Sequence, residues 1–209
     1  IYTGDARSLC HVLGYVGNIT PEQYDSLRDF GYSPNSVVGQ AGVELTAERY
    51  LSGQDGVKPY NIWTVAAEEG VFFSENIGKD AVPGYNVRLT IDLNLQQIAE
   101  NSLKNVIEQI RNSPDNQNKG DADAGAVVML DARTGAVLAM VSYPDYDPND
   151  FIQQAYNEDA ASRVAEYLTD NVNKPMMNRT IMEIYAPGST FKPATAVAAL
   201  ESGTITPSG

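Results

Sequence analysis

The chain has very few of the side chains that bind metals or form disulfides. Its 209 residues include one cysteine, Cys10, and one histidine, His11. No disulfide can form within the chain, and no zinc site can be assembled from Cys and His ligands. Because the two residues are neighbours in an apolar stretch, we interpret them as core filling rather than as a catalytic pair.

Basic residues are also scarce. There are 14 Lys and Arg against 27 Asp and Glu, which gives a formal net charge of −13. Nucleic acids and anionic lipid surfaces attract clusters of Lys and Arg, so the composition argues against both as partners. The acidic residues are scattered as on an ordinary solvated surface, and a hydrophobic content of 43% is sufficient for a packed core.

Long apolar runs are missing as well. The runs over 126–130 and 136–141 fall far short of the ~18 residues that a membrane span requires. The chain begins at Ile1 rather than at a methionine. We therefore expect it to be a segment of a longer protein whose membrane anchor or signal lies elsewhere.

Turn-forming residues divide the first region, which runs to about Arg88. Thr20, Pro21 and Gln23 together form a helix start, with a capping threonine, a proline at the first position and a capping-box partner. Gly31 is a typical helix stop. We further expect a strand over 11–19, a short helix over 43–51 and a strand over 60–73.

The second region opens at about Leu89. Apolar residues recur every three or four positions from Leu95 to Ile110, which predicts one face of a long helix capped by Asp92. The runs 125–130 and 136–142 predict an antiparallel hairpin with its turn at 132–135. Both strands are nearly all apolar, so we expect both faces to be covered. Residues 143–151 are interpreted as a connection, and 155–168 as weakly helical.

The sharpest chemical signal is the sequence YAPGSTFKP at 185–193. The turn at Pro187 and Gly188 precedes a run of helical composition, so Ser189 is expected at a helix start with Lys192 one turn later on the same face. A serine becomes a nucleophile when a neighbouring base takes its proton, and a lysine removed from water can be that base. Helix-start N–H groups would stabilise an oxyanion. As a bare Ser-x-x-Lys pattern, the pair is better explained as a capping serine and a solvated lysine.

The wider sequence resembles class B penicillin-binding proteins, whose signature includes Ser-x-x-Lys. TIDLNLQ at 90–96 resembles the opening of their transpeptidase domain, and GAVVMLDARTGAVLAMVSYPDYDPNDF at 125–151 resembles its first hairpin and following loop. HVLGYVGNI at 11–19 and GQAGVELTAERYLSGQDG at 39–56 resemble the preceding pedestal, or dimerisation domain. Asn178-Arg179 ahead of YAPGSTFKP also fits this family.

The resemblance implies an α+β fold. Residues 1–88 would be part of the pedestal, and 89–209 the start of a serine D,D-peptidase/β-lactamase-like domain with an antiparallel sheet flanked by helices. It implies a peptidoglycan D,D-transpeptidase on the extracytoplasmic face of the cell membrane, with Ser189 as nucleophile and Lys192 as proton shuttle. Its ligands would be stem peptides ending in D-Ala-D-Ala and β-lactam antibiotics. Division or elongation proteins could dock on the pedestal, and no metal or organic cofactor is implied.

The sequence also departs from the family pattern. No lysine begins a Lys-Thr-Gly motif, and the two Ser-x-Asn strings, at 33–35 and 74–76, precede Ser189 and are interpreted as turns. We therefore expect this chain alone to lack activity. One alternative is a class D β-lactamase or β-lactam sensor, although β-lactamases lack a long pedestal. The other is a non-catalytic interaction module of the cell-wall machinery.

Overall fold

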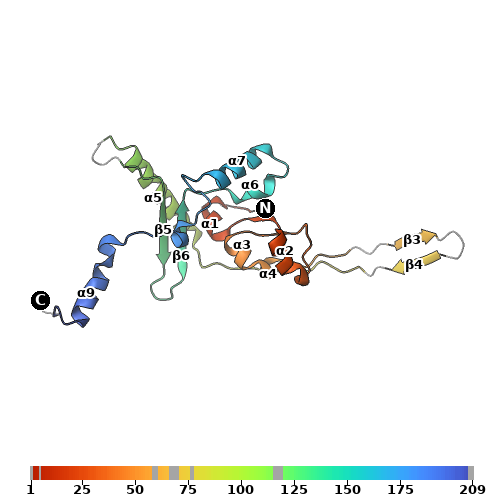
Figure 1. The fold of residues 1–209 in the computed structure, drawn as a ribbon, viewed down its shortest axis with the longest axis horizontal. Coiled ribbons are helices and arrows are strands. Elements are labelled where there is room, and N and C mark those ends of the chain that lie inside the picture. Colours follow the sequence, from red (N-terminus) through yellow and green to blue (C-terminus); the bar gives the residue numbers. More distant parts are fainter. Residues whose placement is uncertain are drawn as a thin grey trace.

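The structure is a computed structural model that describes residues 2–4, 6–57, 61–65, 71–75, 78–114 and 120–206. It is a mixed helix and sheet fold, as predicted (Figure 1). The described strands form three antiparallel pairs: β1 Val16–Asn18 with β2 Val37–Gly39, β3 Asn61–Val65 with β4 Val71–Glu75, and β5 Gly125–Leu130 with β6 Val137–Tyr143.

Helices lie beside the pairs β1–β2 and β5–β6 (Figure 1). The described α-helices are α1 Cys10–Leu13, α2 Pro21–Leu27, α3 Gly42–Thr46, α4 Glu48–Leu51, α5 Leu93–Arg111, α6 Pro148–Gln153, α7 Glu158–Thr169, α8 Arg179–Met182 and α9 Lys192–Glu201. Three 3₁₀ helices accompany them: η1 Arg7–Leu9, η2 Arg28–Phe30 and η3 Gly188–Phe191. The hairpin β3–β4 projects from one side of the body, and α9 projects from the other (Figure 1).

The helix start at Thr20 is confirmed. The Thr20 hydroxyl accepts a hydrogen bond from the Gln23 N–H, and the Gln23 side chain accepts one from the Thr20 N–H, which completes the capping box of α2. The stop is also confirmed, because Gly31 adopts a left-handed conformation with φ 93° after η2. The capping box and the glycine stop both pair backbone groups that a helix end would otherwise leave without hydrogen-bond partners.

The expected strand over 11–19 is wrong in its first half. Residues 10–13 form α1, and only Val16–Asn18 pair as a strand. The break lies at Gly14, which has φ 80° and approaches Ala41 so closely that a Cβ atom would lie 1.9 Å from the Ala41 carbonyl oxygen. The glycine therefore ends the helix and permits the close crossing of two backbones.

Two other segments are divided where one element was expected. The helix over 43–51 is α3 followed by α4, separated at Ala47, whose φ of −102° and ψ of 8° interrupt the helix. The strand over 60–73 is instead β3 and part of β4, whose intervening residues 66–70 lie outside the described part. The first Ser-x-Asn string, at 33–35, lies in a turn as predicted. The second string was also expected to be a turn, but its Ser74 lies within β4, and its Asn76 lies outside the described residues.

The long helix and the hairpin expected in the second region are confirmed. The long helix is α5, and the Asp92 carboxylate caps it by accepting hydrogen bonds from the N–H groups of Asn94 and Leu95. The predicted hairpin is β5–β6, with Val127 opposite Val141 and Gly135 at φ 74° in the turn. Helix α5 packs against β6, where one core cluster forms from Ala99, Ala139, Val141, Leu95, Leu103 and Val127.

Coverage of both hairpin faces is not observed. Val128 and Leu130 of β5 remain 47% and 56% exposed, whereas Ala139 of β6 is fully buried. Helix α5 covers one face, and among the described residues the far end of β5 has no comparable cover.

The connection expected over 143–151 contains a helix, α6. Asp147 caps it by accepting a hydrogen bond from the Asn149 N–H, and Pro148 occupies its start. This is an ordinary acidic cap followed by proline, a start signal that the interpretation as a loop overlooked. The weak helix expected over 155–168 is α7, capped by Asn157.

A second core cluster joins the first region to the second. It consists of Cys10, Tyr146, Phe151 and Val164, with Tyr15, Tyr167 and Met176 against it. The rings of Tyr15 and Phe151 stack with their centroids 3.9 Å apart. Cys10 is 1% exposed, so its interpretation as core filling is confirmed.

Candidate active site

Ser189 and Lys192 lie at the junction of η3 and α9. Gly188 precedes them with φ 53°, which turns the chain into the 3₁₀ helix. The Lys192 N–H donates a hydrogen bond to the Ser189 carbonyl oxygen, closing one 3₁₀ turn between the two residues. Side chains three residues apart nearly eclipse in 3₁₀ geometry, so this turn favours a hydroxyl and an amine on one side of the chain.

Both residues are open to solvent in this structure. Residues 181–198 are exposed throughout, and α9 extends away from the strand pairs (Figure 1). Within the described part, no hydrogen bond joins the side chains of Ser189 and Lys192. The Thr190 hydroxyl instead donates to the Pro187 carbonyl oxygen at 2.6 Å, which stabilises the turn ahead of them.

The chain that leads to Ser189 is anchored upstream by residues 175–179, called here the strap. The Ser142 hydroxyl of β6 donates to the Met177 carbonyl oxygen at 2.9 Å, and it accepts from the Arg179 N–H at 3.0 Å. The Arg179 guanidinium donates to the carbonyl oxygens of Asn173 and Lys174 at 2.6 and 3.1 Å. Arg179 is 5% exposed, so its charge is neutralised by dipoles and by Glu183 at 3.9 Å rather than by water.

The strap also contacts α1. The Nε2 atom of His11 lies 2.7 Å from the Pro175 carbonyl oxygen, and the Asn178 Nδ2 group donates to the His11 carbonyl oxygen at 3.1 Å. The Asn178 Oδ1 atom faces the other way and caps α8, accepting from the N–H and the hydroxyl of Thr180. Asn178 thus joins α1 to α8 through the two ends of one amide.

Further side chains of the second region bond the main chain of η1 and α1. The Gln96 side chain donates to the Ser8 carbonyl oxygen at 2.8 Å, and the Tyr146 hydroxyl donates to that of Cys10 at 2.8 Å. The Cys10 carbonyl oxygen also accepts from the Gly14 N–H at the end of α1, so the Tyr146 hydroxyl is its second donor. Leaving a buried donor such as this hydroxyl unpaired costs about 1–3 kcal/mol, so the contacts hold α1 firmly.

Burial determines the protonation of Cys10 and His11. Burial raises the pKa of the Cys10 thiol to about 12, so it keeps its proton. Burial, with the nearby Arg179 charge, lowers the pKa of His11 below its ordinary value, although the Pro175 contact and Asp145 oppose the shift. Because a carbonyl oxygen only accepts, Nε2 of the neutral ring carries the hydrogen, and Nδ1 accepts from the thiol at 3.3 Å.

A cluster of charged side chains links η1 to α5 through Asp145. Asp145 meets Arg7 of η1 at 2.5 Å and Lys104 of α5 at 2.6 Å. Burial alone would raise the pKa of Asp145, but the hydrogen bond from Lys104 and the charge of Arg7 outweigh burial and lower it. Sequence reasoning missed this cluster and the strap, since both depend on residues far apart in the chain. Only Asn178 carried a local signal, as a capping residue ahead of a short helix.

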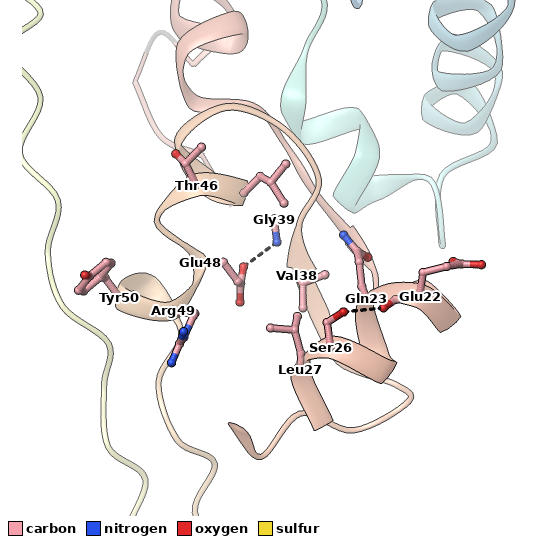
Figure 2. A pocket seen from close by; sticks show the side chains of 11 residues that line it. Glu22, Gln23, Ser26, Leu27, Val38, Gly39, Thr46, Glu48, Arg49 and Tyr50 are labelled. Carbon is pink, nitrogen blue, oxygen red and sulfur yellow. Dashed lines mark hydrogen bonds between the residues drawn. The ribbon is translucent and has the colours of Figure 1, made fainter. Parts of the chain in front are cut away.

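A hollow of about 710 Å³ lies far from Ser189, between α2, β2, α3 and α4. Figure 2 shows Leu27 and Val38 in it, with Glu22, Arg49 and Tyr50 around it. The Glu48 carboxylate accepts a hydrogen bond from the Gly39 N–H at 2.6 Å, which holds α4 against β2 (Figure 2).

Family comparisons agree with this architecture. The model described as Penicillin-binding Protein dimerisation domain matches residues 3–89, and that described as Penicillin binding protein transpeptidase domain matches residues 125–209. The chain therefore belongs to the class B penicillin-binding proteins, in which a dimerisation domain precedes a transpeptidase domain. The dimerisation match disfavours the β-lactamase and sensor alternatives.

Individual relatives point the same way. Peptidoglycan D,D-transpeptidase MrdA of Acinetobacter baumannii is 32% identical over 93% of this chain and 25% of the relative. Penicillin-binding protein 3 of Bacillus subtilis is 33% identical over 93% of this chain and 25% of the relative. The chain thus spans about a quarter of the length of these curated relatives.

Solved structures share the fold. Pseudomonas aeruginosa PBP2 in complex with WCK 5153 superposes with a TM-score of 0.63 at 32% identity, covering 97% of this chain and 35% of that chain. The penicillin-binding protein PBP2 from Helicobacter pylori superposes with a TM-score of 0.61 at 24% identity over 96% of this chain and 33% of that chain, and supports the fold alone.

Proposed function

We propose that the protein to which this chain belongs is a peptidoglycan D,D-transpeptidase, with Ser189 as nucleophile and Lys192 as its proton shuttle. The observation that carries the proposal is the single 3₁₀ turn that joins these two residues inside the segment matching the transpeptidase family. The names of the relatives support the same activity.

The residue types suit acyl transfer. The Ser189 Oγ atom attacks the carbonyl carbon between the two terminal D-alanines of a stem peptide, while Lys192 takes the hydroxyl proton. The proton passes to the departing D-alanine amine, and an ester to Ser189 forms. An amine of a neighbouring stem then attacks the ester, forms the crosslinking amide and returns a proton to Ser189. The Ser189 N–H would supply one donor to the oxyanion.

Labelling with a fluorescent penicillin tests the proposal, because a β-lactam acylates the same serine. In the full-length protein we expect covalent label that disappears in Ser189→Ala and falls by ~10²-fold or more in Lys192→Ala. Label that persists in Ser189→Ala would refute the assignment of the nucleophile. No label on the full-length protein would refute the activity.

The ligands and location follow from this activity. The partners would be stem peptides ending in D-Ala-D-Ala and β-lactam antibiotics, and the site would face the extracytoplasmic side of the cell membrane. Within the described residues, no helix has the length and apolarity needed to cross a membrane.

A second function is favoured by the hollow of Figure 2. We propose that the dimerisation region docks other proteins of the division or elongation machinery there. Apolar Leu27, Val38 and Leu45 line it, and the large apolar side chain of Tyr50 at its rim is 64% exposed. Exposed apolar surface of this kind is common where proteins bind each other. Tyr50→Arg should abolish pull-down of such partners by the full-length protein while penicillin labelling persists, and unchanged pull-down would refute this docking site.

A further inference from the structure

We propose that the strap, residues 175–179, sets the position of Ser189 relative to α1, with Asn178 as the main positioning residue. The inference rests on the proposed function, because it concerns the reactivity of Ser189. It assigns to α1, which lies in the part matching the dimerisation domain, an influence on acylation in the part matching the transpeptidase domain.

The strap is bound on two sides. On one side, the His11 ring and the His11 carbonyl oxygen of α1 contact Pro175 and Asn178 at 2.7 and 3.1 Å. On the other side, Ser142 of β6 bonds both Met177 and Arg179. A segment held by four hydrogen bonds between a helix and a strand has a defined place relative to both.

Among the described residues, the strap is the last buried part of the chain before Ser189. Arg179 is the last buried residue before Ser189, and every residue from 181 to 198 is exposed. Nothing described between α8 and η3 holds the chain as the strap does. The chain therefore leaves its last buried anchor at Asn178 and Arg179, and α8 followed by residues 183–187 leads from there to the reactive turn at Gly188.

Asn178 is suited to transmit the position of α1. Its Nδ2 group bonds α1, and its Oδ1 atom caps α8, so a shift of α1 acts directly on the start of the helix that leads to Ser189. The side chain is 8% exposed, which leaves water little access to replace either bond. Small displacements of a reacting group have large kinetic effects.

Acylation of the full-length protein by a fluorescent penicillin tests the inference, with thermal unfolding measured in parallel. Asn178→Asp keeps the oxygen that caps α8 but turns the donor to His11 into an acceptor. We expect its second-order acylation rate to fall about tenfold or more at a temperature where it is fully folded. His11→Phe keeps a ring against Tyr146 but removes the Nε2 donor to Pro175, and we expect a fall in the same direction. The matched control is Asn157→Asp at the cap of α7, which should acylate at the rate of the unmodified protein.

The outcomes separate the inference from the function on which it rests. Unchanged acylation rates in folded Asn178→Asp, or in His11→Phe if the first variant does not fold, would overturn the positioning role while the nucleophile stands. An equal fall in Asn157→Asp would overturn it too, because the effect would then belong to any capping residue. Label that survives in Ser189→Ala would instead overturn the proposed function.

Discussion

His11 is a half-buried ring whose contacts require its neutral form. The Nε2–H group donates a hydrogen bond to the Pro175 carbonyl oxygen, and Nδ1 accepts one from the Cys10 thiol. A second ring proton would have to sit on Nδ1, where it would displace the thiol hydrogen. The charged groups that bear on the ring are Arg179, which opposes protonation, and Asp145, which favours it. Burial is the largest influence, and the net result is a lowered pKa.

A pH dependence of folding follows from that lowered pKa. The unfolded chain binds the proton near the ordinary value of 6.5 and the folded chain binds it only at lower pH. Stability from this site is therefore complete above about pH 6.5 and is lost as the pH falls towards the folded pKa. Urea unfolding at pH 8 and at pH 5.5 should show a loss that is smaller in His11→Phe. An identical loss in both proteins would contradict the prediction.

Gly14 shows how one missing side chain determines a local structure. Its φ of 80° and ψ of −148° lie in a region essentially reserved for glycine, and a Cβ atom would overlap Ala41. We expect Gly14→Ala to lower the free energy of unfolding by about 2–5 kcal/mol. Gly135→Ala is the control, because Gly135 also has a positive φ but has open space around it. Its cost should be about 1–2 kcal/mol, and equal losses would show that the close approach is unimportant.

At the scale of elements, α6 and α7 are joined by an ion pair with defined geometry. Asp150 accepts from the Arg163 Nε and NH2 groups at 2.9 and 2.6 Å, and from the Tyr167 hydroxyl at 2.9 Å. The hydrogen bond from Arg163 is the main reason that the pKa of Asp150 is lowered. The Arg163 side chain is 46% exposed, so water screens part of the attraction.

We expect Asp150→Asn to lower the free energy of unfolding by about 1–2 kcal/mol, since the substitution removes charge-assisted bonds while it keeps the shape of the side chain. Chemical denaturation at neutral pH measures this loss. Asp159→Asn, on the exposed face of α7, should change little. Comparable losses in the two variants would mean that the Asp150 contacts contribute no more than general surface charge.

Elements with strong local signals were predictable from the sequence. The capping box of α2, the acidic cap and regular spacing of α5, and the turn of β5–β6 each lie within a short stretch of chain. The failures have longer-range causes. Residues 11–13 have strand-like composition but form α1, which ends at Gly14 beside Ala41. The side chains of Tyr146 and Asn178, more than a hundred positions away, bond the Cys10 and His11 carbonyl oxygens of this helix. Which faces of the β5–β6 hairpin are covered likewise depends on tertiary packing, and the spacing of apolar residues along the two strands does not determine it.

The candidate site divides in the same way. Ser189 and Lys192 were found from a local motif and its setting, and the structure places them on one 3₁₀ turn. Their catalytic roles remain predictions. The strap that precedes them was not predicted beyond the fit of Asn178-Arg179 to the family, because its meaning depends on Ser142 and His11, which only the folded chain brings close.

In the whole molecule, the contacts between the two regions differ in strength. The Arg7 side chain is 52% exposed, whereas that of Asp145 is 8% exposed and also meets Lys104, so water screens the ion pair between Arg7 and Asp145 only in part. The aromatic cluster around Tyr146 and the buried bonds to η1 and α1 exclude water and should dominate. The two regions are thus joined by apolar packing, by buried hydrogen bonds and by one partly screened ion pair.

The surroundings of Ser189 lead to a prediction for the 209-residue chain by itself. A lysine acts as base for a serine when its surroundings exclude water, yet here both Ser189 and Lys192 are exposed. The family resemblance places a second oxyanion donor on a Lys-Thr-Gly strand, a motif that this sequence does not contain. Removing one such donor commonly costs ~10²–10³ in rate. We therefore expect fluorescent penicillin to label this chain at least ~10²-fold more slowly than the full-length protein. Ser189→Ala versions of both provide the background, and rapid Ser189-dependent labelling of the short chain would show that one helical turn is sufficient for acylation.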